Sequence, residues 1–303
     1  MQFRRTRFAP SPTGYLHLGH LAHIVWLWTT ADRYNAKIHL RLEDHDQSRC
    51  KEIFAHSIIE DLKWLGLLDT SVTLSMIANQ TNLSKLNQYN SFANKLIQDG
   101  HVYACDCSRK DVALQQVTSV VSGSNQNADE LKYNGRCRDR KIPLNSPNVS
   151  WRVKVPDRNF KISDLNIGDL VQNPFLMHGD FVIKDKSSNW TYNFCVVIDD
   201  LDDQIDLIVR GTDLIPSTGR QLALREMIAP DSKIPTFLHH PLLMDKLGKK
   251  LSKRHQSDSM LSARDRGLTP GQLIETLALP KQLIAQFVKA ANPNHIGSLL
   301  GNP

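Results

Sequence analysis

The chain has 303 residues, of which 41% are hydrophobic, so it is long enough for one large or two medium domains with a full core. It carries 37 Lys and Arg against 31 Asp and Glu, a net charge of +6, which mildly favours a polyanionic partner. No long apolar run follows the basic residues near the start, so we expect neither a signal peptide nor a membrane span, and a cytoplasmic protein. Five cysteines, an odd number, argue against a disulfide framework and raise the question of metal binding.

The first stretch predicts a strand, a turn and a helix. Residues 4–9 favour a strand, two prolines and Gly14 then impose a turn, and apolar residues recur at three- and four-residue spacing over Leu18–Ala31. His17, Gly19 and His20 therefore fall in the first helical turn, where free backbone N–H groups can receive a phosphate and the glycine admits a flat ring. The same residues also fit an ordinary core helix with two solvated histidines.

A second strand is predicted over Lys37–Glu43, so that strand, helix and strand form a parallel unit. No Gly-x-Gly-x-x-Gly occurs, which counts against a dinucleotide cofactor. The acidic residues 43–46 fall where a doubly wound sheet places its ligand-contacting loops. On spacing alone, Glu43 is equally a ligand for a substrate ammonium group and part of a solvated acidic turn. Two further helices, over residues 51–65 and 86–98, are assigned to packing.

Three cysteines and a tyrosine follow in the next part of the chain. Residues 101–107 predict a short strand with Cys105 and Cys107, and Cys137 comes four positions after Tyr133. Thiolates one residue apart can reach the same ion, and zinc prefers a tetrahedral set that includes sulfur. On chemistry alone, a zinc site and three reduced thiols remain equal alternatives, because Cys-x-Cys is less specific than paired Cys-x-x-Cys. Residues 117–129, rich in Ser, Asn and Gln, predict a mobile surface insertion.

Strands are predicted next over residues 151–155, 180–185 and 193–198. The acidic run Asp199–Asp203 lacks the spacing and glycine of an EF-hand, so we expect a solvated turn or helix cap. Residues 208–214 predict a buried strand that delivers Arg210 to its exposed end. There the guanidinium either binds a carboxylate through two parallel hydrogen bonds or forms a structural ion pair with Asp206 or Asp213.

Beyond a helix expected over residues 216–227, His239 and His240 are treated as structural, and short helices broken by prolines are expected over 268–288. The run Lys250-Leu251-Ser252-Lys253-Arg254 alone fits either a solvated charge run or a phosphate-binding patch. Together with His17-Leu18-Gly19-His20, it resembles the paired signatures of class I aminoacyl-tRNA synthetases in order and separation. Residues 7–14, Arg-Phe-Ala-Pro-Ser-Pro-Thr-Gly, resemble the glutamate-specific branch.

This resemblance implies an α/β fold with a Rossmann-like, doubly wound parallel sheet. It implies that ATP, with Mg²⁺, activates L-glutamate to glutamyl-adenylate. The implied catalytic residues are His17, His20 and Lys253, and the implied ATP-binding residues are His17, Gly19, His20, Lys250 and Lys253. The implied glutamate-binding residues are Arg7, Ser11, Glu43, Tyr192 and Arg210, with the roles of the two arginines left open.

The cysteine and tyrosine pattern resembles that of the glutamyl-queuosine tRNA(Asp) synthetases, truncated paralogues of the glutamyl-tRNA synthetases. That resemblance implies one structural zinc on Cys105, Cys107, Tyr133 and Cys137, and transfer of glutamate to queuosine in the anticodon of tRNA(Asp). It implies catalytic halves over residues 1–100 and 191–240, an inserted zinc-binding acceptor-type subdomain over 101–190, and the lysine loop with a small helical region over 241–303. We expect a monomer and no anticodon-binding domain. The alternatives are an enzyme that charges a tRNA 3′ end and an inactive tRNA-binding module.

Overall fold

The first part of the chain forms the parallel unit that its sequence predicts. The computed structural model describes residues 1–117, 131–244 and 259–291, so nearly all of the predicted insertion lies outside the described residues. Strand β1 (Arg5–Phe8) leads into helix α1 (Leu18–Tyr34), and β2 (Lys37–Leu42) returns parallel to β1. Asn35, at a φ of 53°, ends the helix in the left-handed conformation that lets the chain turn into β2.

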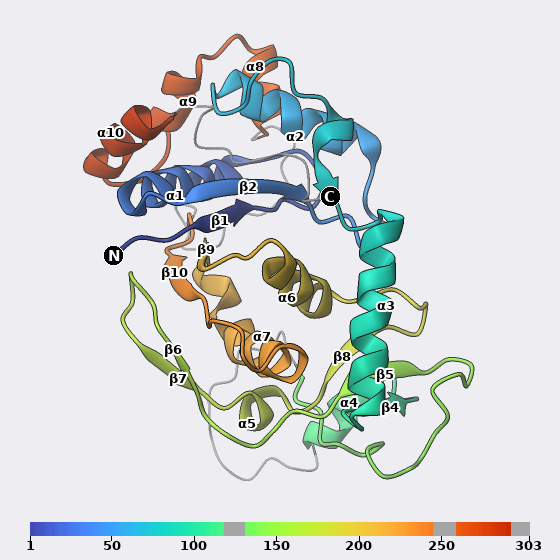
Figure 1. Cartoon of the computed structure of the whole chain (residues 1–303). Helices are drawn as coiled ribbons and strands as arrows, with labels where there is room; N and C mark the ends of the chain where they lie inside the picture. Colours follow the sequence, from blue (N-terminus) through green and yellow to red (C-terminus); the bar gives the residue numbers. More distant parts are fainter. Residues whose placement is uncertain (118–130, 245–258, 292–303) are drawn as a thin grey trace.

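A second parallel unit lies beside the first (Figure 1). Its strands β9 (Leu207–Gly211) and β10 (Thr236–His240) pair in parallel and are connected by helix α7 (Ile215–Ile228). The Asp206 N–H donates to the Arg5 carbonyl at 3.2 Å, so β9 begins next to the start of β1. Two sheets therefore run outward from the place where β9 adjoins β1: β1, β2 and β3 (Ala78–Asn79) on one side, and β9 and β10 on the other. Ligands of doubly wound sheets bind at such a switch point, beyond the carboxyl ends of the strands.

An antiparallel region separates the two parallel units in sequence. Helix α3 (Leu83–Gln98) runs from the first unit toward a sheet with the strand order β4-β5-β8 (Figure 1). These strands are β4 (Val102–Cys105), β5 (Ser150–Val153) and β8 (Phe181–Lys184). A separate hairpin joins β6 (Phe160–Ile162) to β7 (Leu170–Gln172). The strands predicted near residues 101, 151 and 180 are thus confirmed, while the proposed domain boundaries stay a prediction.

Helices cover the sheet and extend the core toward the end of the described chain. Buried side chains of the last helices, including Phe287, belong to the same core cluster as Trp28 of α1. Within the described residues, no helix combines the length and apolar character needed to cross a membrane. The remaining helices are α2 (Glu52–Trp64), α4 (Arg109–Val117), α5 (Pro174–His178), α6 (Tyr192–Asp202), α8 (Met260–Asp265), α9 (Pro270–Glu275), α10 (Lys281–Ala290) and the 3₁₀ turns Leu74–Met76 and Thr212–Leu214.

The strand predicted over residues 193–198 is wrong, because this segment lies within helix α6. The run Val196, Val197 and Ile198 has high β propensity, but every residue from Phe194 to Asp200 is buried. A helix buried on all sides shows no amphipathic period, so a short apolar run cannot be distinguished from a buried strand by pattern. Packing of α6 against neighbouring elements therefore decides its conformation.

Candidate active site

Two histidines cap the start of α1. The His17 side chain accepts a hydrogen bond from the Gly19 N–H at 3.0 Å, and the His20 ring accepts one from the His17 N–H at 3.1 Å. This reciprocal arrangement is a capping box, and the first turn contains no acidic residue to neutralise the positive end of the helix dipole. The predicted helix start is confirmed, with His17 as its N-cap. This end of the helix is suited to binding an anion.

Gly19 is required by the ring of His17. A Cβ atom added at Gly19 would lie 2.8 Å from His17 Cε1 and 3.0 Å from His17 Nδ1, closer than such contacts normally allow. The space that a side chain would fill at position 19 is therefore taken by the capping imidazole. Any larger residue would displace His17 from the helix start.

An open pocket of about 430 Å³ lies between α1 and the ends of β9 and β10. It joins the start of α1 to Arg210, so it lies at the switch point between β1 and β9. A pocket there, with a positively polarised helix end and an arginine on its walls, is suited to a ligand that carries both phosphate and carboxylate groups. Its lining residues are His17, Gly19, His20, Ala22, His23, Arg210, Gly211, Asp213, Leu214, His240, Pro241, Leu242 and Leu243.

The described residues on both sides of the predicted lysine loop lie next to this pocket. Leu242 and Leu243, which precede the loop, line the pocket itself. Ser259, which follows the loop, forms an antiparallel β-bridge with His17, and the N–H of the next residue donates to the Leu16 carbonyl at 2.8 Å. Lys250 and Lys253 lie outside the described residues.

Arg210 is buried, and its hydrogen-bond partners are uncharged groups. Its Nε donates to His239 Nε2 at 3.0 Å, Nη1 to Gln221 Oε1 at 2.7 Å and Nη2 to Thr218 Oγ1 at 2.6 Å. Burial lowers the pKa of Arg210 to about 10, opposed by the neighbouring Tyr192. The expected alternative, an ion pair with Asp206 or Asp213, is wrong: no such pair forms among the described residues, and the Asp206 carboxylate instead accepts from backbone N–H groups at the start of β1.

The acidic run at the end of α6 is not the solvated turn that we considered, although Asp203 is the C-cap of the helix, as the other alternative expected. Asp200 is 4% exposed and pairs with Arg7 at 3.1 Å and with Arg41 at 2.8 Å. Arg41 also pairs with Asp203 at 2.8 Å. Burial alone would raise the pKa of Asp200, but the two arginines outweigh it and hold that pKa below its ordinary value. Asp199 and Asp200 are buried, and β1 and β2 each direct an arginine toward this end of α6, whereas Asp202 is exposed.

The remaining predicted glutamate-binding residues lie close to these charges. Glu43 is 5% exposed, so the alternative of a solvated turn is wrong, and its carboxylate accepts from Arg41 at 3.3 Å. Burial raises the pKa of Glu43, opposed by Arg41 and Arg7. The Glu43 N–H donates to the Pro10 carbonyl at 3.1 Å, which brings it beside Ser11. The electrostatic neighbours of Tyr192 include Glu43, both predicted arginines and Asp200. The five predicted side chains therefore belong to one region.

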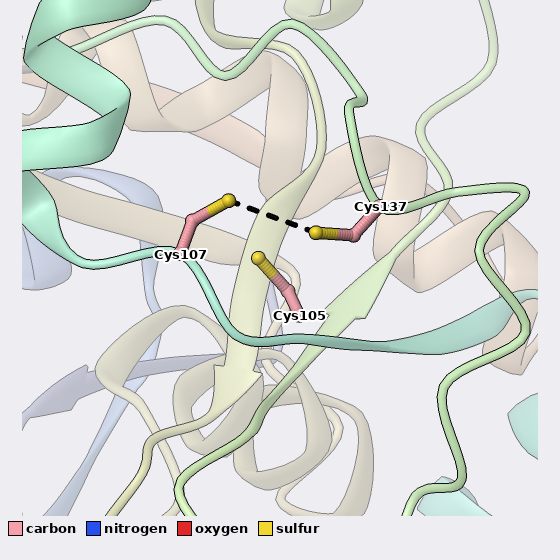
Figure 2. Close-up of side chains that lie close together, drawn as sticks. All are labelled: Cys105, Cys107 and Cys137. Carbon is pink, nitrogen blue, oxygen red and sulfur yellow. Dashed lines mark hydrogen bonds between the residues drawn. The ribbon is translucent and has the colours of Figure 1, made fainter.

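The four predicted metal ligands also come together. Figure 2 shows the sulfurs of Cys105, Cys107 and Cys137 pointing toward one another, and the three lie within 4.8 Å. The Cys107 and Cys137 sulfurs are 3.6 Å apart, and the Tyr133 hydroxyl lies 3.4 Å from Cys105 Sγ and 4.0 Å from Cys107 Sγ. A tetrahedral zinc with Zn–S bonds of about 2.3 Å places its sulfurs about 3.8 Å apart, so the donor set fits the ion.

Tyr133 is held in place by its backbone and by its ring. Its N–H donates to the His178 carbonyl at 2.9 Å, and its hydroxyl accepts from the Cys137 N–H at 2.9 Å. The Arg152 guanidinium lies 3.8 Å from the ring centroid. Gly179, with a φ of 66°, lies so close that an added Cβ would be 1.9 Å from the Tyr133 carbonyl oxygen. A glycine is therefore needed at position 179 both for its conformation and for this contact.

Several residues at the candidate site were missed by sequence reasoning. In β2, His39 and Arg41 alternate with the buried aliphatic residues of a strand that is covered on both faces. A buried polar residue in such a strand needs a partner, and this signal could have identified Arg41. No local pattern distinguishes Asp164, Gln221 or the role of His239, because their contacts with one another and with Arg210 join distant segments.

A family model described as tRNA synthetases class I (E and Q), catalytic domain, matches residues 4–285 of the chain. Glutamate–tRNA ligase 2 of Syntrophus aciditrophicus is 35% identical over 283 residues, which cover 91% of this chain and 57% of the relative. The glutamate–tRNA ligase of Thermodesulfovibrio yellowstonii is 34% identical over 278 residues, which cover 90% and 56%. The chain thus spans little more than half the length of these relatives.

The fold also has a counterpart among solved structures. The glutamate-tRNA synthetase from Elizabethkingia anophelis superposes with a TM-score of 0.66 at 24% identity. The superposition covers 84% of this chain and 53% of that one. At this identity the likeness supports the fold, which agrees with the predicted α/β architecture.

Proposed function

The chain belongs to the class I tRNA synthetases whose catalytic domain is of the glutamate and glutamine type, and on this premise we propose that it activates L-glutamate with ATP. An α-carboxylate oxygen of glutamate attacks the α-phosphorus, the bond to the bridging oxygen breaks, and pyrophosphate leaves. The product is glutamyl-adenylate. This step needs no nucleophile from the enzyme, so catalysis rests on positioning and on stabilising charge at the phosphates.

The observation that carries the choice of glutamate is the environment of Arg210. Its cation is 3% exposed and lines the pocket, yet its hydrogen-bond partners are all uncharged: an imidazole, an amide, a hydroxyl and the phenol of Tyr192. A buried charge is costly without an opposite charge, so a substrate carboxylate would complete this site. Arg7 already pairs with Asp200. We therefore assign the side-chain carboxylate of glutamate to Arg210, and the substrate ammonium group to Glu43.

The start of α1 supports the assignment of the triphosphate. His17, Gly19 and His20 present a helix end, with no acidic residue in its first turn, to the same pocket that contains Arg210. Lys250 and Lys253 complete the proposed site from the segment whose two flanks adjoin this helix end, and Mg²⁺ accompanies ATP. Ammonium groups and Mg²⁺ neutralise the charge that develops on the leaving pyrophosphate.

For the second step we propose transfer of glutamate to the queuosine base of tRNA(Asp). A hydroxyl of the cyclopentene diol attacks the carbonyl carbon of the adenylate, an ester forms, the hydroxyl proton is lost and AMP leaves. The support is the Cys-x-Cys and Tyr-x-x-x-Cys set, which resembles that of the queuosine-modifying family. Charging of a tRNA 3′ end is the second candidate, favoured by curated relatives that are named glutamate–tRNA ligases.

We also propose that one structural zinc is held by Cys105, Cys107, Tyr133 and Cys137. When bound, the ion replaces weak contacts among thiols and a hydroxyl with four strong bonds that cross-link β4 to the loop around Cys137. The protein contributes the fixed phenol oxygen. Burial and the neighbouring thiols raise the pKa of Tyr133, opposed by the Cys137 N–H, so the charge of a bound ion is what would favour the phenolate.

The test of the first step is glutamate-dependent exchange between ATP and pyrophosphate, measured with and without tRNA. We expect exchange with L-glutamate and much less with L-aspartate or L-glutamine. No exchange above background with L-glutamate under either condition would refute adenylate formation. The acceptor is tested separately, by transfer of labelled glutamate to tRNA(Asp) with queuosine, to tRNA(Asp) without it, and to tRNA(Glu). If only tRNA(Glu) becomes labelled, the result would favour the second candidate, charging of a tRNA 3′ end.

A further inference from the structure

The guanidinium of Arg210 is oriented by a histidine on the neighbouring strand. The register of the β9–β10 pair places His239 directly opposite Arg210. The His239 side chain has no exposed surface, and its Nε2 accepts the Arg210 Nε–H at 3.0 Å. The Arg210 guanidinium and the His239 ring both lie against Phe237, at 5.1 Å and 5.7 Å between centres. The contact is therefore fixed by the sheet and shielded from water.

A carboxylate decides which ring nitrogen of His239 carries the proton. Asp164 Oδ2 lies 2.6 Å from His239 Nδ1 and also accepts the His239 backbone N–H at 3.1 Å. The other carboxylate oxygen accepts the N–H groups of Asn166 and Ile167 at 2.9 Å and 3.0 Å. Because an ionised carboxylate only accepts hydrogen bonds, the proton lies on Nδ1. Nε2 then keeps the lone pair that Arg210 requires.

The charges around His239 keep its ring neutral. Burial lowers the pKa of His239 to about 4, Arg210 and His240 lower it further, and Asp164 opposes the shift. Burial would raise the pKa of Asp164, but the N–H groups of Ile167 and Asn166 and the ring of His239 hold it below its ordinary value. At neutral pH the carboxylate is therefore ionised and the imidazole is an acceptor, which is the state that the geometry needs.

The N–H groups of Arg210 are only partly used by its neighbours in the protein. A guanidinium has five N–H groups, and His239, Gln221 and Thr218 take one each from Nε, Nη1 and Nη2. Two N–H groups remain on the terminal nitrogens, and the hydroxyl of Tyr192, itself a predicted glutamate-binding residue, lies within hydrogen-bonding reach of the guanidinium. Two parallel donors are what a carboxylate needs for bidentate binding. Gln221 is itself held by Asn193, to which its amide donates at 2.9 Å.

We propose that His239 is a positioning residue for substrate binding, and that Asp164 acts through it by setting its tautomer. His239 does not contact the substrate; it removes one rotational freedom from Arg210 so that the two remaining donors face the pocket. This inference rests on the proposed function, because the bound group is the side-chain carboxylate of L-glutamate. It adds a specificity determinant that the sequence motifs do not contain.

Two conservative substitutions separate positioning from simple packing. In His239→Gln the amide oxygen can occupy the place of Nε2 and still accept from Arg210. In His239→Asn the shorter amide reaches only the place of Nδ1, so it can serve Asp164 but not Arg210. We expect the Kd for L-glutamate to rise about tenfold or more in His239→Asn and by less than about threefold in His239→Gln, since hydrogen bonds to charged groups are among the stronger ones.

The KM for ATP in pyrophosphate exchange should stay within about twofold of the wild type in both variants, because the lost contact concerns only the carboxylate site. His56→Asn and His56→Gln, on an exposed turn of α2, are the matched controls. Equal glutamate affinities for the two His239 variants would overturn the positioning role. A wild-type protein that binds no L-glutamate would instead refute the proposed function.

A nitrogen NMR measurement provides evidence that does not depend on substrate or on a folded variant. We expect the wild-type His239 ring to show a protonated Nδ1 and an unprotonated Nε2 at pH 7, unchanged down to about pH 5 because burial holds its pKa near 4. In Asp164→Asn the amide can donate to Nδ1, so the tautomer should change and glutamate affinity should fall as in His239→Asn. A wild-type ring protonated at Nε2 would contradict the inference directly.

Discussion

Ser259 and His17 form an antiparallel β-bridge, which joins a residue five positions beyond the run Lys250–Arg254 to the N-cap of α1. The bridge is extended by the Met260 N–H, which donates to the Leu16 carbonyl at 2.8 Å. The described chain that follows the second signature is thus attached to the helix start that carries the first. The same helix start also lines the pocket that contains Arg210.

The first prediction concerns Arg210. Arg210→Lys keeps a positive charge but loses the planar fork that binds a carboxylate with two parallel bonds. We expect the KM for L-glutamate in pyrophosphate exchange to rise by roughly 10- to 100-fold, with a much smaller change in the KM for ATP. Arg225→Lys, a buried arginine of the same helix-and-sheet unit outside this pocket, is the control. If Arg210→Lys and Arg225→Lys lose exchange activity to the same extent, with no specific rise in the KM for L-glutamate, the substitutions damage the fold and not the carboxylate site.

The second prediction concerns Gly19. A methyl group at this position would lie 2.8 Å from the His17 ring, so Gly19→Ala should push the imidazole away from the helix start. We expect a loss of at least about tenfold in the exchange rate at saturating substrates, because the displaced ring no longer meets the phosphates. Gly271→Ala, where an added Cβ has open space, should keep wild-type exchange. Unchanged exchange in Gly19→Ala would remove His17 from the mechanism.

The third prediction concerns metal binding and Gly179. Both Gly179 and Gly168 have positive φ, 66° and 81°, but only Gly179 contacts the Tyr133 backbone. Gly168→Ala measures the strain of the conformation alone, roughly 1–2 kcal/mol. Gly179→Ala adds the clash with Tyr133, so we expect it to reduce zinc content in metal analysis, as Cys105→Ser should.

Cys50→Ser, outside the cluster, should retain the zinc content of the wild type. Metal content that is the same in Gly168→Ala and Gly179→Ala would show that Tyr133 is not a ligand. Zinc-free wild-type protein, purified without chelator and after addition of zinc, would refute the whole set.

The fourth prediction is a pH dependence of stability from Asp61. Its carboxylate is fully buried and lies 3.0 Å from Arg264 Nε, which joins α2 to α8. Burial raises the pKa of Asp61 to about 7, with Arg264 opposing the shift. The folded state then binds this proton more strongly than the unfolded chain, whose pKa is near 4. The stabilisation is fully present below about pH 4 and is lost as the pH rises through about 7.

Urea unfolding at pH 5 and pH 8 measures this effect. Between these two values Asp61 lowers the free energy of unfolding, whereas buried histidines with a lowered pKa, such as His239, raise it in wild type and variant alike. The free energy of unfolding of Asp61→Asn should therefore rise relative to that of the wild type from pH 5 to pH 8. Glu60→Gln, at an exposed neighbouring position, should keep the same difference from the wild type at both pH values. An unchanged difference between Asp61→Asn and the wild type would mean that Asp61 does not titrate in this range.

Much of the local architecture could be predicted from the sequence. The prolines before α1, the apolar spacing within it and the alternation along β2 act over a few residues, so the parallel unit and the position of His17 at the helix start were foreseen. The spacing of Cys105 and Cys107, with Cys137 further along the chain, likewise indicated that one ion could be shared, and the family resemblance added Tyr133. The prediction of secondary structure failed where every side chain of a segment is buried, as from Phe194 to Asp200 in α6, because Val and Ile residues favour strands when considered alone.

The sequence by itself determined which short elements form and which side chains are available for chemistry, because backbone restriction and hydrophobic spacing are local properties. Only the tertiary structure decided how the charges are shared: Asp200 with Arg7 and Arg41, and Arg210 with the neutral ring of His239. Electrostatic energies depend on distance and burial, and both arise when β1, β2, β9, β10 and α6 pack together. Arg210 therefore remained one of two candidate arginines until its partners were seen to be uncharged.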